Sequence, residues 1–272
     1  GDVYKRQLVM RMKENNPDRV IYLADARQSM HFIQVFRCAR KTGIVPDTTE
    51  LVHIGFGTMN GKDGKPFKTR DGGVMRLEYL LKEIDDEMLN KIKENQKEKE
   101  NLNIDEAEAE QTAKTVALAA VKYGDLSNQA SKDYIFDIDR FTSFEGNTGP
   151  YILYTIVRIK SILSKYEAKG GDISALKDAI MPAVNAGQKN LMLSLAKFNA
   201  TIESAYEESA PHKICAYIYE LANAFNGFYH DTKILSEENE ELKKSYISLL
   251  VLTKEILEAC IDMLGFSAPD RM

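Results

Sequence analysis

The sequence predicts an α/β region followed by an all-α region. A strand, a helix and a second strand follow one another between residues 19 and 54. After residue 137 the apolar residues recur only at helical spacing. The length of 272 residues, with 44% hydrophobic and 28% charged residues, is enough for two modest globular domains. We therefore expect a first domain at residues 19–144 and a second at residues 145–272.

Residues 1–18 are expected to lie outside these domains. The chain begins Gly1-Asp2-Val3, without an initiator methionine and without the apolar core of an export signal. This segment is interpreted as the ragged edge of a longer reading frame or an artificial extension.

The first domain opens with a predicted βαβ unit. Residues 19–24 are an apolar, partly β-branched run, residues 29–42 have apolar side chains at helical spacing before Gly43, and residues 51–54 form a second apolar run. Such units are usually parallel and right-handed. Two strands cannot form a doubly wound sheet, so we expect an incomplete parallel sheet, with the other strands upstream.

The remainder of the first domain is predicted to be a loop and two helices. Glycines punctuate residues 55–76, which indicates a hairpin-like loop. Residues 77–97 and 105–122 have the pattern of amphipathic helices, and residues 134–137 that of a short strand.

The second domain is predicted to be an antiparallel helical bundle. Its apolar faces and short connections indicate four helices, at residues 148–166, 185–208, 212–230 and 241–264.

A basic, glycine-rich loop at residues 61–73 is the sharpest local feature. It carries Lys62, Lys65, Lys68 and Arg70, and its glycines permit close approach to a ligand. Mobile Lys and Arg side chains can stabilise the charge of a leaving pyrophosphate. The alternative interpretation is a basic hairpin exposed to solvent.

A second candidate site follows the first predicted strand. In open α/β sheets, ligands bind beyond the carboxyl ends of the strands. Gln28 and His31 lie there and offer hydrogen bonds or stacking to a nucleotide. The alternative is structural, with Asp25 or Ser29 capping the following helix.

Composition excludes some classes of function. The net charge of −5 argues against binding of polyanions by bulk charge, although local basic patches remain compatible with RNA binding. No apolar run is long enough to span a membrane. No spacing typical of metal ligands joins the histidines to the cysteines. The cysteines, Cys38, Cys215 and Cys260, are far apart in the sequence and are expected to be buried free thiols.

Several motifs resemble bacterial arginyl-tRNA synthetases, class I aminoacyl-tRNA synthetases, in the same order along the chain. The resemblance covers residues 19–272. The motifs are IYLADARQSMHF at 21–32, the loop at 61–73, KYGDLS at 122–127, DYIFD at 133–137, FEGNTGPY at 144–151, CAYIY at 215–219 and PDRM at 269–272.

The resemblance implies a partial Rossmann-type catalytic domain and a C-terminal anticodon-binding bundle. The implied activity is an arginine–tRNA ligase, which joins L-arginine and ATP, with Mg²⁺, into arginyl-adenylate and transfers arginine to its tRNA. A cytoplasmic monomer without membrane contact is implied as well.

The resemblance also implies roles for residues of the first domain. Phe67, Lys68, Thr69 and Arg70 stand where class I enzymes carry the KMSK loop, with Lys65 nearby. Lys68, Arg70 and Lys65 are the expected phosphate contacts. Gln28 resembles the glutamine that holds the amino-acid substrate, and His31 is expected near the adenosine.

In the second domain the implied tRNA contacts are Tyr229 and Met272. An aromatic face can stack on an unpaired anticodon base. By helical spacing, two of the three aromatic residues Phe225, Phe228 and Tyr229 should be core residues. Asn147 is expected either to cap the helix that begins near residue 148 or to contact tRNA.

The sequence departs from the family pattern in lacking a HIGH-type motif and the upstream carboxylates that would hold the substrate guanidinium. The chain by itself is therefore expected to be inactive in aminoacylation, and its remaining strands to expose apolar faces. The alternatives are a stand-alone, non-catalytic tRNA-binding module and a helical scaffold protein.

Overall fold

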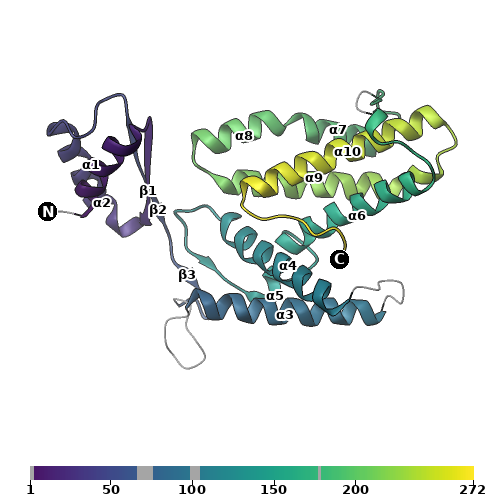
Figure 1. The fold of residues 1–272 in the computed structure, drawn as a ribbon, viewed down its shortest axis with the longest axis horizontal. Coiled ribbons are helices and arrows are strands. Elements are labelled where there is room, and N and C mark those ends of the chain that lie inside the picture. The colour runs from purple at the N-terminus through teal and green to yellow at the C-terminus, as the bar shows by residue number, and fades with distance from the viewer. Residues whose placement is uncertain (1–2, 66–75, 99–104, 177–178) are drawn as a thin grey trace. The chain divides into compact units, whose positions relative to one another are not determined.

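The computed structural model describes residues 3–65, 76–98, 105–176 and 179–272, and these are mostly helical (Figure 1). The elements are α1 (Val3–Asn15), β1 (Arg19–Asp25), α2 (Ser29–Lys41), β2 (Glu50–Phe56), β3 (Met59–Asn60), α3 (Leu77–Glu98), α4 (Glu106–Leu126), β4 (Tyr134–Ile135), α5 (Ile138–Phe141), α6 (Gly149–Ala168), α7 (Ala186–Ala196), α8 (Phe198–Glu207), α9 (Pro211–Asp231) and α10 (Glu240–Met263). The predicted order of an α/β region followed by an all-α region is confirmed.

The chain divides into two compact units. The first comprises Gly1–Pro66 and Gln129–Ile135, and the second comprises Phe67–Asn128 and Phe136–Met272. Helices α3 and α4 therefore share a unit with the bundle helices.

The first unit contains the predicted parallel βαβ arrangement. Strands β1 and β2 pair in parallel, with Arg19 opposite Glu50 and Asp25 opposite Phe56. Val20 and Tyr22 are buried, whereas the alternate residues Ile21 and Leu23 are exposed. Side chains of a strand alternate between the two faces of its sheet, so one face is covered and the other presents apolar side chains to solvent, as expected.

The covered face has an aromatic core to which α1 contributes. Leu8 of α1 and Phe32 of α2 are fully buried and pack in one cluster with the buried Tyr22 of β1. The Tyr4 ring packs on Phe32, with centroids 4.8 Å apart. The prediction that residues 1–18 lie outside the domains is therefore wrong for residues 3–15, which form a helix that completes this core.

The segment after β2 differs from the predicted hairpin-like loop. Strand β3 pairs in parallel with β4, which is distant in the sequence. Gly57, just before β3, lies so close to the chain that a Cβ would sit 2.5 Å from the backbone of Lys132. Only glycine fits where the two backbone segments come this close, and residues 129–135 thereby lie beside β3.

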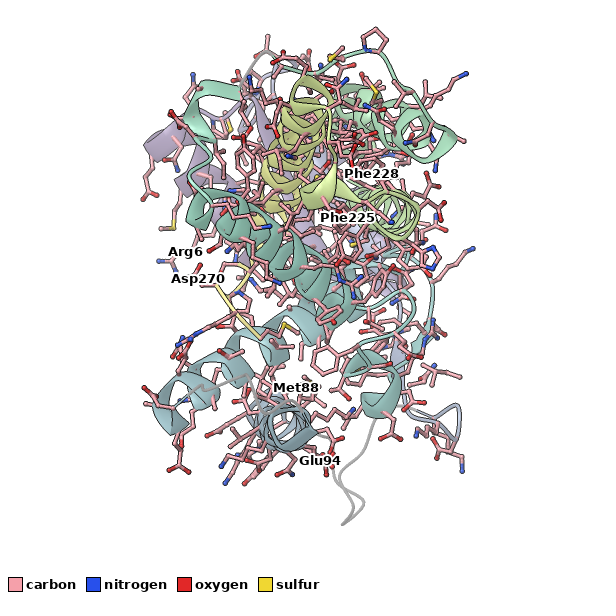
Figure 2. All side chains as sticks on the ribbon, turned by 90° about the vertical axis from the view of Figure 1, so that its right-hand side faces the viewer. Arg6, Met88, Glu94, Phe225, Phe228 and Asp270 are labelled. Atoms are coloured by element: carbon pink, nitrogen blue, oxygen red, sulfur yellow. The ribbon has the colours of Figure 1, made fainter. Side chains whose placement is uncertain are left out.

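In the second unit, α3 and α4 form an antiparallel pair. Leu80, Ile84, Met88 and Ile92 recur every four residues on α3 and are buried. Figure 2 shows Met88 on this helix. They meet the alanine-rich face of α4, because small side chains let two helices approach closely.

Helices α6, α7, α9 and α10 form the predicted bundle, and α4 packs against α6. Thr148 caps α6 by accepting a hydrogen bond from the Tyr151 N–H at 3.2 Å. Asn147 does not cap the helix; its Oδ1 accepts from the buried Tyr123 hydroxyl at 2.6 Å.

The helix predicted at residues 185–208 is two helices. Asn185 caps the first, α7, by accepting from the Gln188 N–H at 2.8 Å. The chain breaks at Lys197, which ends α7 and precedes α8. No glycine or proline marks this position, so the apolar periodicity could not reveal the break.

No helix among the described residues is both long and apolar enough to cross a lipid bilayer. The three cysteines are free; Cys215 and Cys260 are buried as predicted, whereas Cys38 is only partly buried.

Candidate functional site

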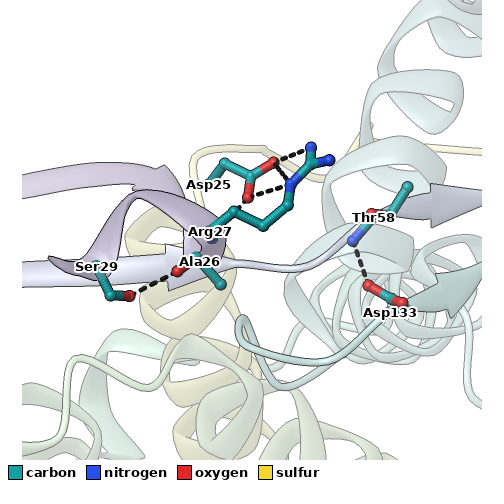
Figure 3. A network of polar contacts seen from close by, with 6 residues as sticks. All are labelled: Asp25, Ala26, Arg27, Ser29, Thr58 and Asp133. Carbon is teal, nitrogen blue, oxygen red and sulfur yellow. Dashed lines mark hydrogen bonds and ion pairs between the residues drawn. The ribbon is translucent and has the colours of Figure 1, made fainter. Parts of the chain in front are cut away.

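An ion pair organises the turn that follows β1. The Asp25 carboxylate accepts hydrogen bonds from Arg27 Nε at 2.9 Å and from the Arg27 N–H at 2.8 Å (Figure 3). Hydrogen bonding by the Arg27 side chain lowers the pKa of Asp25 to about 2. The Ser29 hydroxyl donates to the Ala26 carbonyl at 2.6 Å. Asp25 therefore caps the short turn before α2, which is the structural alternative raised above.

The two candidate ligand residues of this turn lie at the start of α2. Gln28 occupies the N-cap position and is exposed, and its side chain makes no capping hydrogen bond. His31 is exposed as well, with its ring 5.5 Å from that of Tyr4. Both side chains are therefore accessible to a ligand at the carboxyl end of β1.

A second connection in the first unit joins Thr58 to Asp133. The Thr58 N–H donates to Asp133 Oδ1 at 2.6 Å (Figure 3). The Tyr134 N–H donates to the Thr58 carbonyl at 3.2 Å. The chain leading into the basic loop is thus fixed to the segment before β4.

Lys65 is the only candidate phosphate contact among the described residues. It is exposed on a tight turn, in which its N–H donates to Asp63 Oδ1 at 3.1 Å and its carbonyl accepts from the Gly61 N–H at 2.8 Å. Phe67, Lys68, Thr69 and Arg70 lie outside the described residues. Their predicted roles stay predictions.

The second unit has a hollow of about 660 Å³ beside α6 that brings Tyr229 and Met272 together. Side chains of α6, the end of α9 and the C-terminal residues line it. The lining residues are Tyr154, Val157, Arg158, Lys160, Ser161, Ile162, Ser164, Lys165, Tyr229, Asp270, Arg271 and Met272. Both residues proposed to contact tRNA thus belong to one site.

Tyr229 is the exposed member of the aromatic cluster on α9. Phe225 and Phe228, labelled in Figure 2, are fully buried within the bundle, whereas Tyr229 is 41% exposed. This confirms that two of the three are core residues. The Tyr229 ring stacks on Phe225 with centroids 5.9 Å apart and planes inclined by 21°. Packing against the core therefore orients an aromatic ring that still borders the hollow.

Arg158 lies between two tyrosine rings of the hollow. Its guanidinium carbon is 4.7 Å from the centroid of Tyr154 and 5.6 Å from that of Tyr229. Its Nη1 also donates to Asn226 Oδ1 at 2.7 Å. These contacts hold a cation against aromatic faces.

The charges of the hollow are only partly neutralised. Lys160 pairs with Glu258 at 3.4 Å and with Asp270 at 3.3 Å. Within the described part of the chain, Arg158 and Lys165 make no ion pair. The hollow thus contains an aromatic ring together with two cations that can bind an anion. Such a combination suits the base and the phosphate of a nucleotide.

Tyr154 and Arg158 are not among the site residues predicted from the sequence. A signal for them existed, because Tyr154, Arg158, Ser161 and Lys165 recur at spacings of three and four and form a polar stripe on the otherwise apolar helix α6. That pattern does not distinguish a solvated helix face from a binding site.

Among the residues that the structure describes, no three His, Cys, Asp or Glu side chains lie where they could hold a metal ion. Buried Cys215 and Cys260 are poor ligands, because burial raises the pKa of each thiol to about 12.

Two family models match the chain. Residues 6–138 match "tRNA synthetases class I (R), catalytic domain". Residues 152–272 match "DALR anticodon binding domain".

The chain is also similar to known proteins over almost its full length. It is 54% identical to arginine–tRNA ligase of Alkaliphilus oremlandii over 96% of the chain, and 43% identical to that of Francisella tularensis over 97%. The structure resembles arginyl-tRNA synthetase of Plasmodium falciparum, with a TM-score of 0.81, 26% identity and 99% of this chain covered. For the Thermus thermophilus enzyme the TM-score is 0.77, with 25% identity and 94% covered.

The match takes in less than half of each relative. The chain spans 43% and 44% of the length of the two ligases, and 44% and 41% of the two solved chains.

Proposed function

The chain belongs to the arginyl-tRNA synthetase family, and we propose that its second unit recognises the anticodon loop of an arginine-accepting tRNA for an arginine–tRNA ligase. The observation that carries this proposal is the hollow beside α6, where Tyr229, Arg158 and Met272 meet.

The side chains of the hollow suit an unpaired base and its phosphate. Tyr229 offers an aromatic face for stacking, which is sequence-tolerant because every base has a π face. Met272 supplies an adaptable apolar contact. Arg158 and Lys165 carry the positive charge that a phosphate requires, although the chain as a whole is acidic.

The first unit contributes residues to the proposed ligase reaction. Gln28 and His31 at the carboxyl end of β1 would hold arginine and adenosine, and the loop with Lys65 would approach the phosphates of ATP, whose Mg²⁺ comes with the nucleotide. The Lys65 ammonium, exposed on a glycine-supported turn, would stabilise charge on the leaving pyrophosphate. The first unit is thus proposed to bind substrates and to stabilise the transition state.

Binding of RNA hairpins tests the proposal directly. The purified chain is mixed with a labelled anticodon stem-loop bearing an arginine anticodon, and with the same stem-loop bearing another anticodon. Both titrations are done at two salt concentrations. A preference for the arginine anticodon that persists at the higher salt supports base contacts, because phosphate contacts weaken with salt irrespective of sequence. Equal binding that vanishes with salt contradicts the proposal.

A non-catalytic RNA-binding module is the second candidate, favoured by the fact that every lining residue of the hollow lies within residues 154–272. Restoration of charging on addition of the part of the Alkaliphilus oremlandii ligase that this chain does not span, supplied as a separate polypeptide, would favour the ligase, and persistent inactivity would favour the module.

A further inference from the structure

The C-terminal tail, residues 265–272, is attached to α4 at both of its ends. Near the end of α4, Lys122 Nζ donates a hydrogen bond to the Gly265 carbonyl. Near the start of α4, Arg271 Nε and Nη2 donate to Glu108 Oε1 and Oε2 at 2.5 and 2.6 Å. Figure 1 shows this tail, in yellow, leaving α10 and ending beside α6 and α4.

The middle of the tail is attached to α6. Lys160 Nζ donates to the Pro269 carbonyl at 3.3 Å and pairs with Asp270 Oδ1 at 3.3 Å. Figure 2 labels Asp270 on the tail. The attachments therefore follow the tail almost to its last residue.

The tail runs antiparallel to α4. Its first residue, Gly265, is attached near the end of α4, and Arg271 is attached near the start of that helix.

The position of Met272 then follows from Glu108. Met272 is bonded to Arg271, whose guanidinium fork fits the Glu108 carboxylate in a bidentate pair, a geometry that fixes direction as well as distance. Glu108 is itself anchored, because its N–H donates to Asp105 Oδ1 at 2.8 Å at the capped start of α4. Met272 lines the hollow together with Tyr229.

We propose that Glu108 is a positioning residue for RNA recognition, which acts through Arg271 to place Met272 against the hollow. This inference rests on the proposed function of the hollow. Glu108 belongs to the part of the chain that matches the catalytic-domain model, whereas the hollow belongs to the part that matches the anticodon-binding model. A residue of one family region thereby sets the recognition geometry of the other.

The test uses the full chain with E108Q, R271Q and the double variant, and E110Q as a matched control. Glu110 is exposed on the same helix, makes no ion pair among the described residues, and its substitution changes the net charge equally. The readout is the ratio of affinities for the arginine-anticodon and altered-anticodon stem-loops, which a general loss of stability would not change selectively.

Each single variant is expected to lower this ratio of affinities about three-fold, which is the size of effect expected from the loss of an exposed ion pair. The double variant should lower it no further, because both substitutions break the same interaction. E110Q should retain the ratio of the unsubstituted chain. An unchanged ratio in E108Q, or additive losses in the double variant, would overturn the inference.

A second readout separates this inference from the proposed function. Carboxypeptidase release of Met272, followed by mass spectrometry, is compared between E108Q and E110Q, whose tails are identical. Release of Met272 about three-fold faster from E108Q than from E110Q shows that Glu108 holds the tail in place. Equal release rates from the two variants would overturn the claim that Glu108 holds the tail. If the unsubstituted chain does not distinguish the two stem-loops, the proposed function fails, and the release rates still decide whether Glu108 positions Met272.

Discussion

Tyr229 has one ring face packed against Phe225, and 41% of the residue is exposed beside Arg158. We predict that Tyr229→Ala weakens binding of the arginine-anticodon stem-loop about ten-fold, because base–aromatic stacking contributes roughly 1–3 kcal/mol per base. Tyr229→Phe should bind as the unsubstituted chain does, because the ring remains. Fluorescence anisotropy with a labelled stem-loop measures both.

Tyr206→Ala is the control for this prediction, since Tyr206 is an exposed tyrosine of α8 that does not line the hollow. Equal losses in Y206A and Y229A would show that the effect is not specific to the hollow.

The three thiols differ in environment, which predicts a difference in reactivity. Burial raises the pKa of Cys215 and of Cys260 to about 12, and both are fully buried, whereas Cys38 is partly exposed. The thiolate is the reactive species, so iodoacetamide at pH 8 should modify Cys38 first. Peptide mass spectrometry over time checks this, with the chain unfolded in urea as the control in which all three react. Comparable rates in the folded chain would contradict the burial.

At the scale of elements, α6 begins against the backbone of α4. A Cβ on Gly149 would lie 2.3 Å from the Ala119 carbonyl oxygen, and backbone cannot move aside as a flexible side chain can. Gly149→Ala is therefore expected to reduce the free energy of unfolding by about 1–3 kcal/mol, the usual range for overpacking. Urea unfolding followed by circular dichroism measures it.

Gly227→Ala is the matched control. Gly227 lies within α9, where an added Cβ would meet nothing within 4 Å. Alanine favours the helix, so this variant should be about 0.5–1 kcal/mol more stable. Destabilisation by both substitutions would show that the close approach of α4 and α6 is not the cause.

At the scale of the whole molecule, the buried thiols predict a dependence of stability on pH. Their pKa rises from the ordinary value of 9.0 to about 12 on folding, so between these values the unfolded chain has lost protons that the folded chain keeps. Because the unfolded state then binds fewer protons, the free energy of unfolding should be highest below pH 9 and fall as the pH rises towards 12.

Urea unfolding at pH 8 and at pH 10.5 measures this dependence. In the double variant C215A/C260A the free energy of unfolding should decrease less between these two pH values than in the unsubstituted chain. Some decrease should remain, because burial also raises the pKa of Tyr123 and Tyr217. Stability that rises with pH over this range would contradict the prediction.

The 272-residue chain by itself is predicted not to charge tRNA with arginine. Its sequence has the basic loop that is proposed to contact ATP phosphates but no HIGH-type motif, and the chain spans 43% of its relative from Alkaliphilus oremlandii. Filter-bound radiolabelled arginine measures charging, and a full-length ligase is the positive control. Turnover by the chain alone would contradict this prediction.

Most elements of the fold, and the family, could be predicted from the amino-acid sequence alone. Apolar periodicity is a local property, so it predicted β1, α2, β2 and the helices α6, α9 and α10 closely but missed the break between α7 and α8, and ordered motifs identified the family. The same reasoning predicted that Tyr229 would differ from Phe225 and Phe228, because successive helical residues face different directions.

Which distant residues meet could be learned only from the three-dimensional structure. The parallel pairing of β3 with β4 and the attachment of Arg271 to Glu108 join segments far apart in sequence, and no local pattern encodes such partners. The same holds for Arg158, which the sequence presents as one polar residue of α6 and the fold places between two tyrosine rings. Helix propensity and apolar spacing act within a few residues, whereas a binding site depends on packing between whole elements.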